Sequence, residues 1–413
     1  MVFCYCERSE QKRYSGPSMS DKNMELKVAS RMKDFEEGIF QVLNEKKNEF
    51  LAQGRKVYNL SVGTPDFKPA KHIMDAVAQA AMVPDNYKYA LVDLPQLIEA
   101  VIGRFERRYG VVLKAEEIMS VYGSQEGITH IGLTLCDEGD VVLVPNPGYP
   151  IFSIGPALAG AKLVPYDLYE ENGYLPDLEG MDKELLRKTK FMIVSYPMNP
   201  ICRTAPKSFY EHLIPWAKEH NIIIIHDNAY SDIIYDGRKG ISILSIPGAK
   251  EVCAEFYSLS KSYNYTGARM GFLVGNEEIV THFKRLRSQI DYGTFLPVQY
   301  GAIAALNGPD NMIKEQCREY QRRRDALCGG LRSIGWSIPD SEGAMFAWGA
   351  IPEGYEDDVE FVMELLEKSG VLCTPGSSFG TLGRGHVRFA LTIPVEEIEE
   401  AVNAVERSGM IVK

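Results

Sequence analysis

The chain has 413 residues, of which 45% are hydrophobic and 24% charged, the composition of a globular protein of two or three domains. Its net charge of −11 argues against nucleic acid as a partner, because phosphate backbones bind basic surfaces. No apolar run reaches the roughly 20 residues of a membrane helix, so we expect a cytoplasmic protein with no membrane partner.

The first 60 residues are predicted to contain two segments. Residues 1–23 are polar and patternless, and we interpret them as a disordered leader. Residues 24–56 carry apolar side chains at helical spacing. We therefore expect an N-terminal arm over residues 24–60, mainly helical, that packs against a small C-terminal domain.

The middle of the chain alternates between helical patterns and short apolar runs. These runs are Ile118–Tyr122, Asp140–Pro145, Lys190–Pro197, Ile222–Asp227, Ala254–Ser260 and Gly271–Gly275. Continuous apolar strands separated by helices are typical of a mostly parallel sheet that is buried on both faces. The prediction is an α/β large domain over residues 61–306, with helices on both sides of the sheet.

The last part of the chain has a different order of elements. A long helix is predicted from about Gln299 to Leu331. Strands are predicted at Ala344–Ile351, Val371–Gly376 and His386–Pro394, and helices near 359–369 and 395–408. This order predicts a smaller α+β domain over residues 307–413.

The first chemical motif is the segment Ser258–Phe272, which follows an apolar strand. A lysine in such a place is usually a solvated surface group. Here, however, Ser258 precedes Lys261 by three residues and Arg269 follows it by eight. A hydroxyl and a guanidinium can hold a phosphate while the amine forms an imine with an aldehyde cofactor.

A second motif ends the strand at Ile222–Asp227. Asp227 is either a helix N-cap or the partner of a buried cation, such as a protonated pyridine nitrogen. Tyr230 either packs in the core or donates a hydrogen bond to a ring oxygen. A protonated pyridine ring accepts the electrons of a carbanion, so the second alternative has a clear chemical use.

Three further motifs follow predicted strands. The backbone amides of Ser124 and Gln125 open a helix and can face an anion, although most Gly-Ser turns only connect elements. Tyr149 is either a loop anchor or an aromatic that stacks on a cofactor ring. Asn199 precedes a proline, which is commonly turn chemistry, but its amide can also bind a ring oxygen or a carboxylate.

The strand His386–Pro394 carries Arg388 opposite its apolar face. Such an arginine is usually solvated, but it also suits bidentate binding of a carboxylate. Five of these six motifs lie at the carboxyl ends of predicted parallel strands, where open α/β sheets bind ligands. The sequence therefore predicts one site that gathers them.

These motifs resemble those of fold-type-I, class I and II aminotransferases over about residues 24–405, and most closely the branch that holds LL-diaminopimelate and alanine aminotransferases. Gly123–His130, Gly139–Pro150, Ser258–Phe272 and Val387–Leu391 carry the resemblance. It implies pyridoxal 5'-phosphate as cofactor, an amino acid and a 2-oxo acid as substrates in amino-acid biosynthesis, and a homodimer with active sites at the subunit interface.

The resemblance also implies a role for each site residue. Lys261 would form the Schiff base and move the proton, with Asp227 on the pyridine nitrogen and Tyr230 and Asn199 on the phenolic oxygen. Tyr149 would stack on the ring. The phosphate would be held by the segment of Gly123, Ser124 and Gln125 together with Ser258, Ser260 and Arg269. Arg388 would bind the substrate carboxylate, assisted by Asn199 and the backbone of Gly63.

Two departures from the family pattern stand out. Asn199 is followed by Pro200, Ile201 and Cys202, where the family has Pro-Thr-Gly. Lys88 stands where the family has a tyrosine that reaches the neighbouring subunit, and Asp93 stands where it has glycine.

The function predicted from these residues is ping-pong transamination between an L-amino acid and a 2-oxo acid. Two alternatives stay open at this point, a carbon–sulfur lyase on the same scaffold and a non-catalytic protein that binds pyridoxal phosphate. The scattered cysteines and histidines predict neither a disulfide framework nor a metal site.

Overall fold

The computed structural model describes residues 27–34 and 39–411, so the predicted leader at 1–23 lies outside the described residues. The chain divides into two units, residues 1–37 and 38–413. Within the first unit the described residues include one short 3-10 helix, Ser30–Asp34. The features below belong to the second unit.

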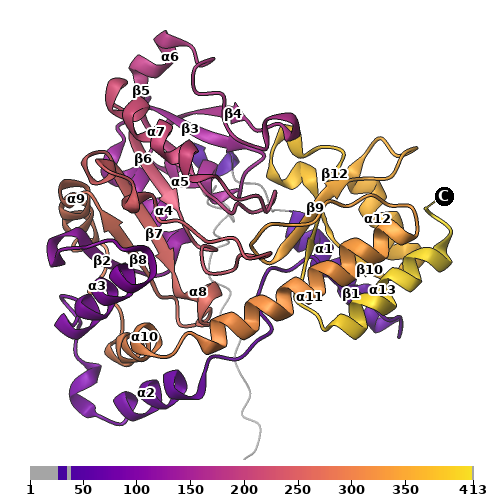
Figure 1. Ribbon diagram of the computed structural model, residues 1–413, viewed down its shortest axis with the longest axis horizontal. Coiled ribbons are helices and arrows are strands. Elements are labelled where there is room, and N and C mark those ends of the chain that lie inside the picture. Colours follow the sequence, from indigo (N-terminus) through magenta and orange to yellow (C-terminus); the bar gives the residue numbers. More distant parts are fainter. Residues whose placement is uncertain (1–26, 35–38, 412–413) are drawn as a thin grey trace, which may run out of the picture. The chain divides into compact units, whose positions relative to one another are not determined.

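A seven-stranded sheet forms the centre of this unit (Figure 1). Its strands are β2 (Ile118–Val121), β3 (Val141–Asn146), β4 (Lys162–Asp167), β5 (Thr189–Val194), β6 (Ile223–Asp227), β7 (Cys253–Ser258) and β8 (Gly271–Gly275). Their spatial order is β2-β8-β7-β6-β5-β3-β4. β8 runs antiparallel to its two neighbours, β2 and β7, and the other six strands share one direction. The prediction of a mostly parallel sheet is thus confirmed. Strand β4 was not predicted from the sequence.

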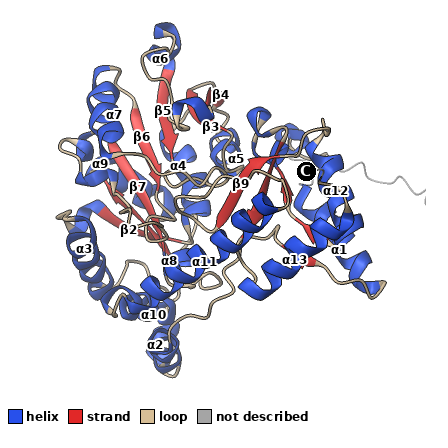
Figure 2. Ribbon diagram, turned by 45° about the vertical axis from the view of Figure 1, so that its right-hand side comes forward, coloured by secondary structure: helices blue, strands red, loops and turns tan. Residues whose placement is uncertain are grey.

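Helices cover both faces of this sheet, as Figure 2 shows. On one face, α4 (Ser124–Leu135), α5 (Ile151–Leu158) and α9 (Glu277–Arg287) bury apolar side chains against the strands. On the other face, α3 (Pro95–Tyr109) and α7 (Lys207–Glu219) do the same. The sheet is therefore the middle layer of three, which explains why its strands read as continuous apolar runs.

The remaining helices of this region are short or lie at its periphery. They are α2 (Lys71–Ala81), α6 (Lys183–Lys188), α8 (Leu259–Ser262) and α10 (Leu296–Asn307). Single 3-10 turns lie at Pro84–Tyr87, Ala115–Glu117, Glu170–Asn172, Ile243–Ser245 and Ala249–Glu251.

The single helix predicted from Gln299 to Leu331 is wrong. The structure has two helices, α10 and the 23-residue α11 (Asn311–Ser333), separated at Gly308 and Pro309. Proline has no backbone N–H and restricts the residue before it, so the chain turns there and begins a new helix. Figure 1 shows α11 running from beside α8 and α10 to the C-terminal elements.

The C-terminal part forms a second core. It contains the antiparallel strands β11 (Thr374–Pro375), β12 (His386–Ala390) and β9 (Phe346–Ala350), the parallel pair of β1 (Tyr58–Asn59) and β10 (Val371–Leu372), and the helices α12 (Asp358–Ser369) and α13 (Val395–Ser408). Two 3-10 turns, Gly376–Phe379 and Thr381–Gly383, lie before β12.

The N-terminal arm contributes α1 (Ile39–Ala52) to this second core through Leu43 and Phe50. The helix predicted over 24–56 is thus shorter, and residues 24–26 and 35–38 of it lie outside the described residues. The same core also includes Tyr230 and Tyr235, which precede the boundary predicted at residue 306. The domain boundaries stay a prediction.

No helix among residues 27–34 and 39–411 is long and apolar enough to cross a membrane. The carboxyl ends of β3, β5, β6 and β7 meet at one edge of the large sheet, since these strands are parallel to one another. The strand β12 with its Arg388 belongs to the second core. The site predicted from the sequence requires these two regions to meet.

Candidate active site

The predicted residues do meet, in a cavity of about 510 Å³. Its walls include Ser124, Gln125, Tyr149, Asn199, Asp227, Tyr230, Ser258, Ser260, Lys261, Arg269, Gly63 and Arg388. Gly123 is the one predicted site residue outside this lining. It is the N-cap of α4 with φ of 83°, and a Cβ there would lie 2.5 Å from an Nη of Arg269. Glycine at this position lets the guanidinium approach the start of the helix.

Lys261 lies in α8, in the turn that follows β7. Its Nζ donates a hydrogen bond of 2.8 Å to the carbonyl oxygen of Gly63. Burial, together with the charges of Arg388 and Arg269, lowers the pKa of the amine to about 8. A lysine with this pKa is partly neutral near pH 8, and it can therefore act as a nucleophile and as a proton acceptor.

Asp227 ends β6 and is almost fully buried. Burial raises the pKa of its carboxyl to about 7, although His226 and Ser124 lower it in part. Its Oδ1 has no hydrogen-bond partner among the described residues. A buried carboxylate oxygen in this state requires a donor, and a protonated ring nitrogen supplies one.

Tyr230 follows three residues later and is also buried. Burial raises the pKa of its phenol well above the usual range, so the hydroxyl keeps its proton and can donate it to a hydrogen bond. The Nζ of Lys261 lies 6.0 Å from the centre of its ring. The amine, the phenol and the carboxyl thus face the same space.

An anion-binding surface lies beside Lys261. The amides of Ser124 and Gln125 open α4 without helical partners, and the helix dipole is positive there. Arg269 links the segment after α8 to the segment before α4. It donates to the carbonyl oxygens of Thr266 at 3.0 Å and of Tyr122 at 3.2 Å. Ser258 caps α8 through its Oγ, which accepts a hydrogen bond of 3.1 Å from the amide of Ser260.

The second core places Arg388 opposite these groups. Its guanidinium is buried and donates to Asn199 Oδ1 at 2.9 Å and to the carbonyl oxygen of Ser61 at 2.8 Å. Burial lowers the pKa of Arg388 to about 10, so the group stays charged at neutral pH. The ring of Phe346 lies below it, with the guanidinium carbon 4.3 Å from the ring centre. This fixed cation suits a substrate carboxylate.

Tyr149 and Gly63 complete the walls. The hydroxyl of Tyr149 donates a hydrogen bond of 3.2 Å to Gln125 Oε1, which holds the ring at the mouth of the anion-binding surface. Gly63 is packed so closely that a Cβ would lie 2.5 Å from the ring of Phe346. Only glycine allows this loop to pass between Phe346 and Lys261.

The structure accommodates both departures from the family pattern. Cys202 takes the glycine position with φ of 57°, an unusual conformation for a residue with a side chain, and is fully buried. Asp93 accepts hydrogen bonds from the amide and hydroxyl of Ser120 at 2.8 and 2.5 Å, and so anchors the loop to β2. Lys88, five residues before Asp93, is exposed.

Sequence reasoning missed several residues of the cavity. They are Ser61, Val62, Thr64, Phe152, Ser195, Ala229, Thr266 and Phe346. It also missed Gln316 of α11, whose Nε2 donates to the carbonyl oxygen of Lys261 at 2.8 Å. The small polar residues near Gly63 are a weak sequence signal of a binding loop. In contrast, nothing in the sequence distinguishes Gln316 from any other residue of a long helix.

A sheet of this topology, with a half-buried lysine, a buried carboxyl and an anion-binding helix terminus at its carboxyl edge, defines a pyridoxal-phosphate-type site. The chain matches the family of class I and II aminotransferases over residues 55–405. It belongs to this family, and it is a pyridoxal-phosphate-dependent aminotransferase.

Known relatives agree with this assignment. The chain is 39% identical to an LL-diaminopimelate aminotransferase of Dehalococcoides mccartyi, over 91% of this chain and 97% of the relative. It is also 39% identical to the enzyme of that name in Aquifex aeolicus, over 92% and 99%.

Solved structures agree as well. Substrate-bound BacF of Bacillus subtilis has a TM-score of 0.89 at 35% identity, covering 92% of this chain and 98% of its own. A probable N-succinyldiaminopimelate aminotransferase of Thermus thermophilus has 0.84 at 33%, covering 90% and 100%. The fold class and the transamination predicted from the sequence are therefore confirmed.

Pyridoxal phosphate fits the residues that are present. The unpaired Oδ1 of Asp227 suits its ring nitrogen, and the start of α4 with Arg269 suits its phosphate. The lowered pKa of Lys261 suits an amine that must react with an aldehyde.

Proposed function

We propose that Lys261 is the catalytic base of this aminotransferase, that Asp227 holds the proton of the cofactor ring, and that Arg388 binds the α-carboxylate of the substrate. The observation that supports this assignment is the convergence of all three groups on one cavity from α8, β6 and β12. The bound cofactor supplies an electron sink for the substrate carbanion.

The chain's own residues account for the remaining requirements. Arg388 and Asn199 orient the substrate by its carboxylate, which places the α-hydrogen toward the Lys261 amine. Lys261 takes the α-proton and later returns it. Tyr149 and Tyr230 form part of the wall of the cavity.

We propose further that the amino donor is LL-diaminopimelate, the amino acid in the name of the curated relatives. Near 39% identity over about nine tenths of the chain supports the same substrate class. The cavity lining beside Gly63 includes the small polar residues Ser61 and Thr64, which suits a donor with a polar distal end.

A donor panel tests this proposal. Purified holoenzyme is mixed with LL-diaminopimelate, alanine, aspartate or glutamate without an acceptor, and the change in cofactor absorbance reports the half-reaction. We expect LL-diaminopimelate to react at the highest kcat/KM, and 2-oxoglutarate or pyruvate to restore the starting spectrum. A higher value for alanine or aspartate contradicts the donor. Release of pyruvate and ammonia without an acceptor would contradict transamination itself.

We also propose that the working form is a homodimer. The loop around 87–92 and the segment 290–295 expose large apolar side chains next to each other. Tyr87 contacts Phe295 and Tyr89 contacts Tyr292, at ring-centre distances of 5.3 and 5.0 Å, while Leu91 is 72% exposed. A contiguous apolar patch of this kind supports association with a second copy.

A further inference from the structure

A second polar cleft lies outside the active site, between α3, the loop that follows β6, and the first half of α11. Its volume is about 490 Å³, enough for a small metabolite. Six of its lining residues are cationic, namely Arg104, Arg108, Arg238, Lys239, Lys314 and Arg318, and three are acidic, namely Asp232, Asp236 and Asp310. The lining is therefore strongly positive on a protein whose net charge is −11.

The three acidic residues are already paired. Asp232 is fully buried and accepts from Arg104 at 3.0 Å and from Arg108 at 2.9 Å. Asp310 accepts from Arg104 at 2.6 Å. These carboxylates hold the two arginines at the floor of the cleft, and both oxygens of Asp232 are occupied, since its Oδ2 accepts from the hydroxyl of Tyr257 at 2.7 Å.

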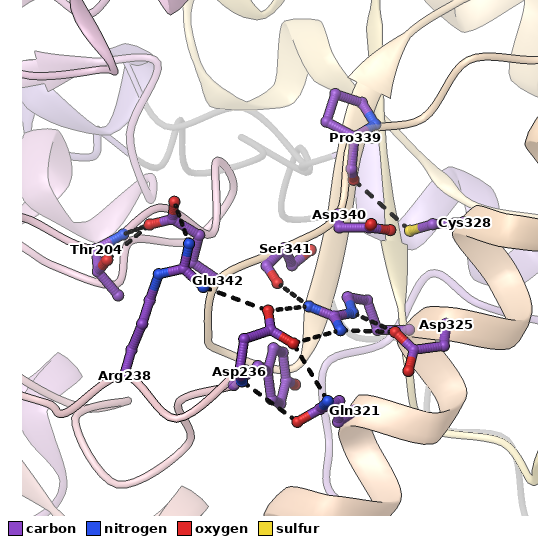
Figure 3. Close-up of polar contacts among 12 residues, drawn as sticks. Thr204, Asp236, Arg238, Gln321, Asp325, Cys328, Pro339, Asp340, Ser341 and Glu342 are labelled. Atoms are coloured by element: carbon purple, nitrogen blue, oxygen red, sulfur yellow. Dashed lines mark hydrogen bonds and ion pairs between the residues drawn. The ribbon is translucent and has the colours of Figure 1, made fainter.

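Asp236 is paired as well. Figure 3 shows it between Arg238 and Gln321, and it also binds the guanidinium of Arg324 at 2.7 and 3.0 Å. This network fixes the turn at Asp236 and Gly237 against α11. The wall of the cleft is therefore preorganised.

Three cations at the rim have no such partners. Lys239, Lys314 and Arg318 are exposed, and none of their side chains makes a hydrogen bond or ion pair within the described part of the chain. Lys314 lies in the first turn of α11, which contains no acidic residue, and the carboxylate of the N-cap residue Asp310 is paired with Arg104. A positive charge is unfavourable there, and Arg318 one turn later adds like-charge repulsion. An anion in the cleft would relieve both effects.

We propose that this cleft is a second binding site, specific for a small anion with at least two closely spaced negative charges, such as a phosphate ester or a polycarboxylate. Lys239, Lys314 and Arg318 bind the ligand, and Arg108 contacts it from the floor. This site is separate from the cofactor phosphate site, because Arg269 and Ser258 line the other cavity.

Calorimetric titration of the holoenzyme tests the proposal, with inorganic pyrophosphate and citrate as two separate probes. We expect saturable binding of at least one probe with one site per chain, weakened by added salt. Saturation by pyrophosphate alone identifies a phosphate ligand, and saturation by citrate alone a polycarboxylate. Absence of saturable binding of both probes overturns the proposal.

Charge reversal locates the site. Lys314→Glu and Arg318→Glu each remove a rim cation from an exposed position, and both are expected to weaken binding at least tenfold. Lys183→Glu is the matched control, because it makes the same charge change at an exposed helix start outside both cavities, and we expect it to bind as the unchanged protein does. Lys314→Arg is expected to restore binding. Equal affinity in the Lys314→Glu, Arg318→Glu and Lys183→Glu variants places the anion elsewhere and refutes this site.

Discussion

Each group at the centre of the active site is held in a state that is unfavourable in the protein alone. Lys261 is an amine whose pKa is lowered by burial, Asp227 is a carboxyl whose pKa is raised, and Arg388 is a buried guanidinium. Such perturbed groups are typical of catalytic sites. In the proposed roles the ring nitrogen of the cofactor pairs with Asp227, whose Oδ1 has no partner among the described residues, and the aldehyde of the cofactor reacts with Lys261.

The pKa of Lys261 leads to a stability prediction for the cofactor-free protein. Its folded pKa of about 8 lies below the value of about 10.4 expected in the unfolded chain, so at pH 7 the buried charge opposes folding. We expect Lys261→Met to be inactive but more stable by about 1–3 kcal/mol, measured by urea unfolding at pH 7.

The pH dependence of this difference provides the control. Between pH 8 and 10.4 the unfolded amine binds more protons than the folded one, so the unchanged protein gains stability as the pH rises. The advantage of Lys261→Met should therefore shrink by pH 10. An advantage that is constant with pH would point to packing and not to charge.

Arg388 leads to a prediction about substrate affinity. Its planar guanidinium donates to Asn199 and Ser61, and in the proposed role it also binds the substrate carboxylate, a combination that a lysine ammonium cannot reproduce. We expect Arg388→Lys to raise KM by about 10- to 100-fold, since a hydrogen bond to a charged group contributes about 1.5–3 kcal/mol. Steady-state kinetics with the preferred donor measures this, and Arg384→Lys, at an exposed position before the same strand, is expected to leave KM unchanged.

Among the elements, α11 connects the two cores. Gln316 lies on its buried face and bridges Asn264, at 2.8 Å, and the carbonyl oxygen of Lys261. Further along the helix, Arg323 forms a bidentate ion pair with Asp66, which follows the Gly63 loop. One helix therefore supports both sides of the active site from behind.

Removing the Gln316 side chain should cost stability. Gln316→Ala leaves the amide of Asn264 and the carbonyl of Lys261 without their buried partner, and we expect a loss of about 1–3 kcal/mol in the free energy of unfolding. Urea unfolding of the holoenzyme measures it. Gln289→Ala, at an exposed position after α9, should change this free energy by less than about 0.5 kcal/mol. A comparable loss in both variants would show that Gln316 has no special role.

The sequence predicted most of the elements, because each apolar run and each helical pattern reflects local periodicity. It failed where the signal was not local. The run Lys162–Asp167 forms an edge strand that is only partly buried, so it lacks the continuous apolar pattern. Gly308 and Pro309 are residues that commonly end a helix, but the helical patterns on both sides of them led to the prediction of one continuous helix. Gln316 and Phe346 became site residues only through tertiary packing.

At the scale of the whole molecule, the exposed apolar patch around Leu91 predicts how the chain behaves in solution. We expect the protein to elute from size exclusion with twice the mass of one chain, measured by light scattering. Leu91→Asp combined with Val92→Asp places two charges in that patch and should shift the protein toward monomer. Val112→Asp is the control, because Val112 is equally exposed outside the patch. A dimer that is unaffected by the double change would place the interface elsewhere.

The length of α11 has a mechanical consequence. Its 23 residues make a rod of about 35 Å, with Gln316 near one end and the contacts to α13 toward the other. Rotating this helix by about five degrees about Gln316 moves its C-terminal end, about 26 Å away, by about 2 Å. A rotation of the C-terminal elements about Gln316 would therefore displace α13 much more than it displaces the backbone of Lys261, to which Gln316 is hydrogen-bonded.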